Sequence, residues 1–261
     1  MKWMIICLAC VFLGCVFGCR KDGGQPSRKA DHGLRVYGSH RLDEPLKKIV
    51  ADFQAHTGIT VSSEFGCGVP KLIPDLKANQ DGDVLVAGEA EELRLATESG
   101  LVASSRTIAW NPFVLVVKVG NPLEVKTPGD LSAARLTLPV PDSGCVSRLS
   151  DQIITAWNLT VAAGKAQRLD RGCKSALGCE MVAKGEADAT FTWRIVAAPV
   201  AGIQMIPIEK AKGAPCECFG IILKNAKHPE AAKQFVDFLL AEKSQAIFRE
   251  AGILDVQERT K

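Results

Sequence analysis

The order of its apolar segments constrains the fold of this chain more than any other sequence feature. The stretch "GDVLVAG" holds four apolar residues in a row, which is typical of a strand buried on both faces of a sheet. In the segment before it, apolar residues recur every three or four positions, the spacing of one helix face: Leu42, Leu46, Ile49, Val50 and Phe53. Strand-like and helix-like segments keep alternating through "RLTLPVPDSG" and "DATFTWRIV". This βαβα order predicts an α/β protein in which helices flank mostly parallel sheets.

The N-terminus, "MKWMIICLACVFLGCVFGC", has the pattern of an export signal. One lysine precedes an apolar run from Trp3 to Gly18, which is shorter than the ~20 residues of a membrane-spanning helix. Such a segment is typical of a signal peptide. The stretch "VFGC" resembles the lipobox of bacterial lipoproteins, which predicts acylation of Cys19. Cys15 in "FLGC" is the alternative lipidation site, and an uncleaved signal anchor is the other interpretation.

Charge and motifs exclude several function classes. The 261-residue chain has a formal net charge of +3 and its basic residues are scattered, so we expect no nucleic-acid partner. Beyond the leader we find no CxxC redox pair, no phosphate-loop motif and no metalloprotease-like spacing of histidines. We therefore expect neither enzymatic activity nor a cofactor, with a thiol-dependent enzyme as the remote alternative.

Six stretches occur in the order found in one known family. They are "VYGSHRLDEPLKKIVADFQAHTGITV", "GDVLVAGEA", "GLVASSRTIAWNPFVLVVKVGNP", "LTLPVPDSG", "KGEADATFTW" and "HPEAAKQFVDFLLAEKSQAIFREAGI". From Val36 to Ile253 the chain resembles the periplasmic molybdate-binding proteins of ABC importers. The resemblance implies a monomeric receptor for a small oxyanion, which works with an ABC permease. With the predicted lipid anchor, it would lie on the periplasmic or other extracytoplasmic face of the membrane.

The resemblance also implies a two-lobed periplasmic-binding-protein-like fold, in which two crossing segments join the lobes and the lobes close on the ligand. Lobe one would comprise residues 34–113 plus 216–261, and lobe two residues 114–215. The predicted signal peptide covers residues 1–18. Residues 19–33 are polar and contain glycine and proline, as expected of a tether.

Four loops have the form of an oxyanion site: "YGSHR", "FGCGVP", "PDSGC" and "RGCKS". Unpaired N–H groups and the helix dipole favour negative charge at a helix N-terminus. Neutral donors of this kind leave no uncompensated buried charge when the site is empty. In the family that the chain resembles, the oxyanion is held between the lobes in this way.

The resemblance implies eight residues that contact the ligand. Arg41 falls where the family has a ligand-binding serine, and Gly68 lies at or next to a second serine position. Ser143 and Ser175 stand near backbone amides that the family uses. The implied substrate-binding set is Ser39, Arg41, Cys67, Gly68, Ser143, Cys145, Ser175 and Trp193.

Three departures from the family pattern are present, and one of them is that the second loop, at Gly68, has lost its serine pair. Arg41 brings a fixed charge and a planar fork that suits oxyanions; the alternative is a solvated surface arginine. Trp193 stands where many members have a tyrosine whose hydroxyl binds the ligand. Its indole N–H donates but cannot accept, and the alternative is a residue of the core.

The cysteines beyond the leader have two interpretations. They are Cys67, Cys145, Cys173, Cys179, Cys216 and Cys218. An even number in an exported chain allows disulfides. Cys216 and Cys218 would then pair with other cysteines, because thiols two apart in a strand cannot easily bridge each other. The alternative is capture of a thiophilic metal or metalloid, with Cys67, Cys145 and Cys173 as its ligands.

Overall fold

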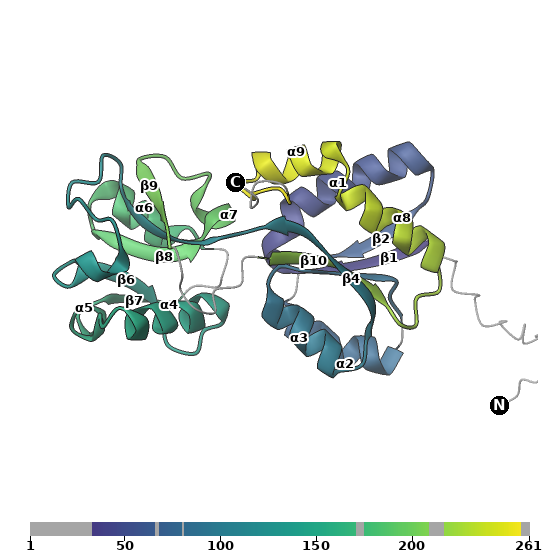
Figure 1. The fold of residues 1–261 in the computed structure, drawn as a ribbon, viewed down its shortest axis with the longest axis horizontal. Coiled ribbons are helices and arrows are strands. Elements are labelled where there is room, and N and C mark those ends of the chain that lie inside the picture. The colour runs from purple at the N-terminus through teal and green to yellow at the C-terminus, as the bar shows by residue number, and fades with distance from the viewer. Residues whose placement is uncertain (1–32, 66–67, 80, 171–174, 209–216, 257–261) are drawn as a thin grey trace, which may run out of the picture. The chain divides into compact units, whose positions relative to one another are not determined.

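Two five-stranded sheets form the framework of the protein in a computed structural model. The structure describes residues 33–65, 68–79, 81–170, 175–208 and 217–256. Helices flank both faces of each sheet (Figure 1). The predicted α/β, two-lobed fold class is thus confirmed. We call the part built on each sheet the first lobe and the second lobe.

The sheet of the first lobe has the strand order β2-β1-β3-β10-β4. Its strands are β1 (Leu34–Gly38), β2 (Val61–Glu64), β3 (Val84–Ala87), β4 (Val102–Trp110) and β10 (Glu217–Leu223). β1 pairs in parallel with β2 and β3, whereas β10 runs antiparallel to β3 and β4. The stretch "GDVLVAG" supplies β3, which is buried along its whole length as its apolar sequence predicts.

Five helices cover this sheet. One face carries α1 (Asp43–Thr57), α8 (Pro229–Leu239) and α9 (Glu242–Glu250), and the other carries α2 (Val69–Asn79) and α3 (Ala90–Glu98) (Figure 1). The predicted apolar face lies on α1, where Leu46, Ile49 and Phe53 are fully buried. The ring of Phe53 packs edge-to-face on Phe235 of α8, 5.1 Å between centroids, a geometry that aromatic pairs favour.

The sheet of the second lobe has the order β7-β6-β8-β5-β9. Its strands are β5 (Phe113–Lys118), β6 (Leu136–Pro139), β7 (Gln167–Leu169), β8 (Ala189–Trp193) and β9 (Ile203–Pro207). The helices are α4 (Cys145–Ala156), α5 (Thr160–Gly164), α6 (Leu177–Lys184) and α7 (Arg194–Ala197). β6 pairs in parallel with β7 and β8, whereas β5 runs antiparallel to β8 and β9. Each sheet is therefore parallel in one half and antiparallel in the other.

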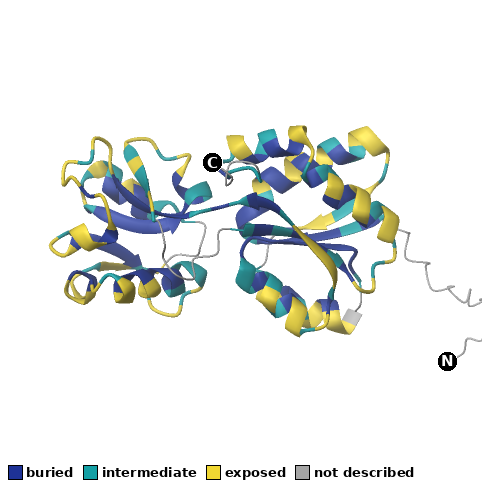
Figure 2. Ribbon diagram, in the orientation of Figure 1, coloured by how far each residue is buried: buried dark blue, intermediate teal, exposed yellow. Residues whose placement is uncertain are grey.

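The carboxyl ends of the parallel strands position the polar residues. The 3-10 helix η1 (His40–Leu42) follows β1, and α3 follows β3. In the second lobe α4 follows β6, and β8 ends at Trp193. Figure 2 shows central strands that are mostly buried and helices whose outer faces are exposed, whereas the edge strands β4 and β9 are largely exposed or half-buried. In open α/β sheets, ligands bind outside the carboxyl ends of the strands, so we expect a binding site at these loops.

Some predictions fall outside the described residues. The signal peptide, Cys15, Cys19 and nearly all of the tether lie there, as do Cys67, Cys173 and Cys216. Among the described helices, none is both long and apolar enough to cross a bilayer. His32–Lys261 form one structural unit, so the predicted lobe limits stay a prediction.

Candidate functional site

Arg41 is the centre of a buried polar cluster that joins the two lobes. Its side chain is only 2% exposed, so it is not a solvated surface arginine. The guanidinium lies over the ring of Trp193, 5.0 Å from the centroid, and Nη1 donates to Cys145 Sγ at 2.9 Å. Trp193 is itself fully buried and packs edge-to-face on Phe113. It therefore serves the core of the second lobe and also contacts Arg41 of the first lobe.

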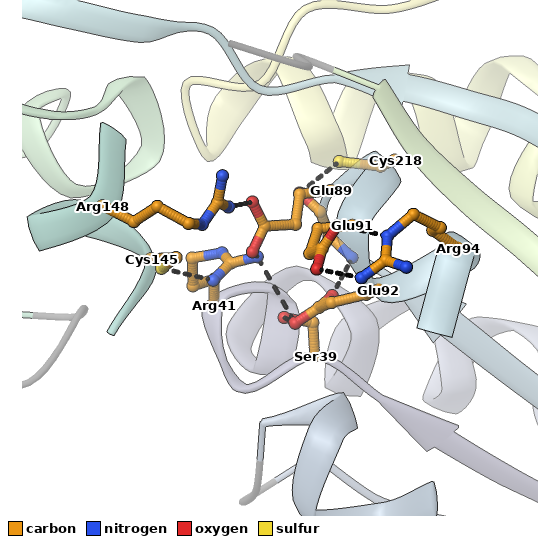
Figure 3. A network of polar contacts seen from close by, with 10 residues as sticks. Ser39, Arg41, Glu89, Glu91, Glu92, Arg94, Cys145, Arg148 and Cys218 are labelled. Atoms are coloured by element: carbon orange, nitrogen blue, oxygen red, sulfur yellow. Dashed lines mark hydrogen bonds and ion pairs between the residues drawn. The ribbon is translucent and has the colours of Figure 1, made fainter. Parts of the chain in front are cut away.

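Two buried glutamates face Arg41 (Figure 3). Arg41 Nη2 lies 3.6 Å from Glu89 Oε1 and 3.5 Å from Glu92 Oε1. Arg148 of α4 donates from Nη2 to Glu89 Oε2 at 2.8 Å. The two arginines and two carboxylates balance in formal charge. This balance lets the cluster remain buried, because an unpaired buried charge is costly.

Two hydrogen bonds hold the carboxylate of Glu92, which lies in the first turn of α3. Its Oε2 accepts the Gly88 N–H at 2.6 Å, and its Oε1 accepts the Ser39 hydroxyl at 3.2 Å. A Cβ at position 88 would come within 2.9 Å of Ser39 Oγ and 3.2 Å of Arg41 Nη2, so glycine is needed there for close approach. The carboxylate of Glu92 thus accepts the hydrogen bond of an amide at the start of α3, and this amide is no longer available to an external anion.

Burial raises the pKa of the Glu89 carboxyl above its ordinary value. The charge of Glu92 raises this pKa further, whereas Arg41 and Arg148 oppose the shift. Desolvation is the largest of these causes. Glu89 therefore accepts a proton more readily than an ordinary glutamate does.

The second lobe holds a small cavity at the carboxyl end of β6. Its volume is about 40 Å³, room for about three waters, since one water needs roughly 10–15 Å³. Ser143, Ser175, Thr192 and Cys179 line it, with apolar residues around them. Ser143 Oγ donates to Val140 O at 2.6 Å. Two of the predicted ligand residues, Ser143 and Ser175, are thereby brought to one cavity.

Two helices begin beside this cavity without a side-chain cap in the described structure. The N-cap of α4 is Gly144, with φ at 122°, and that of α6 is Ala176. Ser175 Oγ accepts the Leu177 N–H at 3.3 Å. The other N–H groups of these first turns have no intrahelical acceptor, and the helix dipoles favour an anion there.

The predicted residues therefore form two groups. Ser39, Arg41, Cys145 and Trp193 belong to the charged cluster, whereas Ser143 and Ser175 line the cavity. The groups adjoin, because Ser143 lies in the turn before α4 and Cys145 is the first residue of that helix. Gly68 is in neither of these contact sets; it lies near His40 of η1, whose Nδ1 would be 3.9 Å from a Cβ added at position 68.

The sequence interpretation missed Glu89, Glu92 and Arg148. The glutamates directly follow a buried strand in "GDVLVAGEAEEL", a place where charged side chains often serve a site. Their position directly after a buried strand is thus the sequence signal that points to the two glutamates. Arg148 offers no comparable signal, because its partner Glu89 is 59 positions away in the chain.

The described cysteines give no support to a metal site. No disulfide joins any two of Cys145, Cys179 and Cys218. Burial raises the pKa of the Cys179 thiol to about 12. Within the described ranges, no group of three or more histidine, cysteine or acidic side chains is placed to hold a metal ion. Pairing with the cysteines outside these ranges, and the soft-metal alternative, stay predictions.

The matching strand orders and the polar groups at the strand ends define a two-lobed binding protein. Residues 34–254 match the family of bacterial extracellular solute-binding proteins, and the chain belongs to this family. Its members are substrate-binding transport proteins, which gives the chain an extracytoplasmic location.

Individual relatives support the same assignment. Molybdate-binding protein ModA of Mycobacterium bovis is 24% identical over 225 residues, which cover 83% of this chain and 82% of that protein. The periplasmic molybdate-binding protein of Azotobacter vinelandii has a TM-score of 0.62 at 19% identity, over 86% of this chain and all of the other. Iron-bound HitA of Pseudomonas aeruginosa has a TM-score of 0.66 at 19% identity, over 83% and 84%. The predicted family resemblance is confirmed, and the solved structures show the shared fold.

Proposed function

We propose that this protein is the lipid-anchored receptor of an ABC importer and binds molybdate or a related oxyanion between its lobes. The observation that carries the proposal is the second-lobe cavity, where Ser143 and Ser175 adjoin two helix N-termini without side-chain caps. Hydroxyls and backbone amides are the donors that bind a desolvated anion without a counter-charge of their own. Arg41 and Arg148 lie beside the same turn, where Glu89 and Glu92 balance their charge.

The similarity to molybdate-binding proteins supports this choice of ligand. The family's role in transport supports a receptor rather than an enzyme, with an ABC permease as its partner. We propose that the protein acts as a monomer and needs no cofactor.

Titration calorimetry with molybdate, tungstate and sulfate tests the proposal. The parent protein should bind at least one of them. Ser143→Ala and Ser175→Ala should each weaken binding by about 1.5–3 kcal/mol, the usual contribution of a hydrogen bond to a charged group. Ser132→Ala is the matched control, because Ser132 is exposed and lies outside the cavity lining.

Binding of none of the three oxyanions would reject the proposed ligand class. Cu(I) and Zn(II) belong in the same titration, because tight binding of these ions alone would favour the soft-metal alternative. Affinity for them should then rise with pH as thiols ionise.

The lipid anchor has its own test. Cys19→Ser should leave an unprocessed, full-length precursor, because the acylated cysteine is the processing site in lipoproteins. Cys15→Ser should be processed as the parent is. If Cys19→Ser is processed and membrane-associated as before, Cys19 is not the anchor; a block in Cys15→Ser instead would identify Cys15.

A further inference from the structure

We infer that Glu89 is an internal counter-ion for Arg41 and Arg148, and that an oxyanion enters this site together with one proton. The inference rests on the proposed oxyanion binding and adds to it a rule of selectivity. The two arginines are held by a carboxylate of the protein itself, so a ligand has to compete with Glu89 for them.

The position of Glu89 supports this role. Its two carboxylate oxygens face different arginines, Oε2 at 2.8 Å from Arg148 Nη2 and Oε1 at 3.6 Å from Arg41 Nη2. Its side chain is 5% exposed. Arg148 is 39% exposed and borders an open groove of about 800 Å³ along α4. Asp142 and Asp151 also line this groove, so an anion there approaches Arg148 beside two carboxyl groups. An anion in this groove can reach Arg148, whereas Glu89 cannot exchange its partners for water without moving.

Glu92 is less suited to this exchange, although it contacts Arg41 too. It accepts hydrogen bonds from the Gly88 N–H and the Ser39 hydroxyl, and both donors remain when Arg41 turns to a ligand. The polar contacts of Glu89 are with the two arginines. An anion that takes these contacts leaves Glu89 buried without compensation, and a buried carboxylate in that state binds a proton.

The charges around Glu89 set the direction of the effect. Arg41 approaches from η1, Arg148 and the Cys145 thiol belong to α4, and Glu92 lies one turn along α3 from Glu89. The arginines and glutamates sum to zero, so a dianion would bring the cluster to −2, and one proton reduces this to −1. The bound anion therefore raises the proton affinity of Glu89, and by linkage protons raise the affinity for the anion.

Titration calorimetry of the full chain tests the inference, with molybdate and sulfate in two buffers of different ionisation enthalpy between pH 6.5 and 8.5. Sulfate carries no proton in this range, so any proton taken up is the protein's. We expect uptake of about one proton per bound anion and, over part of this range, affinity that falls about tenfold per pH unit. Glu89→Gln should abolish the uptake, flatten the profile and bind more tightly at the alkaline end.

Glu98→Gln is the control on the same helix, because Glu98 is exposed and pairs with Arg94 on the exposed side of α3; it should keep the parent profile. Anion binding by the parent without proton uptake, or an unchanged profile in Glu89→Gln, overturns this inference and leaves the proposed function standing. Absence of anion binding by both proteins at every pH overturns both. The parent's two-buffer measurement decides the matter even if the variant does not fold.

Discussion

The two lobes share one framework and differ in what they present at the strand ends. The strand orders correspond one to one: in each lobe two parallel pairs are followed by an antiparallel strand at which the chain enters from the other lobe. Even a local detail is shared. Asp83 before β3 accepts the Arg35 N–H at 2.8 Å, and Asp188 before β8 accepts the Arg135 N–H at 2.7 Å.

The difference lies in the first residues after the strands. The first lobe supplies Arg41, Glu89 and Glu92, and its helix α3 binds a carboxylate of its own. The second lobe supplies hydroxyls and two helices without side-chain caps. One framework thus carries both a charged cluster that is already balanced and a neutral group of donors that is open to an anion. The short loops, and not the sheets, decide which chemistry each lobe can offer.

The largest expected effect comes from removing the central charge of the first lobe. Arg41→Ala leaves Glu89 and Glu92 buried near one fewer cation, and breaking a buried pair in this way costs about 3–5 kcal/mol of unfolding free energy. Urea unfolding at neutral pH measures the change. The loss should be smaller in a Glu89→Gln/Glu92→Gln background, which has no carboxylate to compensate.

Arg94→Ala is the matched control for Arg41→Ala. Arg94 pairs with Glu91 and Glu98 on the exposed side of α3, where solvent screens the charges. Its urea midpoint should stay close to that of the parent. Equal midpoints for Arg41→Ala and the parent would contradict the burial of the cluster.

A smaller loss of stability is expected from replacing the two equivalent aspartates, Asp83 in the first lobe and Asp188 in the second. Asp83→Ala should lower the free energy of unfolding by about 2 kcal/mol, because it leaves the partly buried amide donors of Arg35 and His228 without their acceptor. Asp188→Ala should cost less, since Asp188 is 21% exposed whereas Asp83 is 3% exposed. Chemical denaturation of both variants makes the comparison. A larger loss of unfolding free energy for Asp188→Ala than for Asp83→Ala would contradict this prediction, because it would show that burial does not decide which aspartate contributes more.

Acid should affect the second lobe through Asp188. Its hydrogen bond with Arg135 is the main cause that lowers the pKa of the Asp188 carboxyl. A lowered pKa in the folded state means that the stabilisation is complete above the ordinary aspartate pKa and is lost as pH falls through the folded-state value. The stability difference between the parent and Asp188→Asn should therefore be present at pH 7 and shrink below about pH 4. Urea midpoints at several pH values test this, and a difference independent of pH would contradict it.

The lobe comparison also separates what sequence patterns can predict from what they cannot. The strands and the apolar face of α1 follow from local periodicity. The shared site of Ser143 and Ser175 was implied by the family resemblance, and the structure places both at one cavity. The pairing of Glu89 with Arg148 follows from neither, because it depends on how segments from two lobes meet. Burial of Arg41 had the same origin: its sequence context allows both a solvated and a buried side chain, and the carboxylates that decide between them come from another loop.

The smallest effect is expected for Cys179→Ala in the second lobe. Cys179 lines the cavity with Ser143 and Ser175, but it is 1% exposed and burial raises its thiol pKa to about 12. At neutral pH it remains a protonated thiol, which is a weak donor and neither a nucleophile nor a metal ligand. Oxyanion affinity should change by less than about twofold, well under the effect of removing a hydroxyl that contacts a charged ligand.

Native protein should also resist alkylation at Cys179 until it is unfolded, as mass spectrometry of the labelled peptide can show. Rapid labelling of Cys179 in the folded protein, or a large loss of affinity in the variant, would contradict this prediction. It would mean that the Cys179 thiol takes part in ligand binding and that the second lobe does not bind through hydroxyls and amides alone.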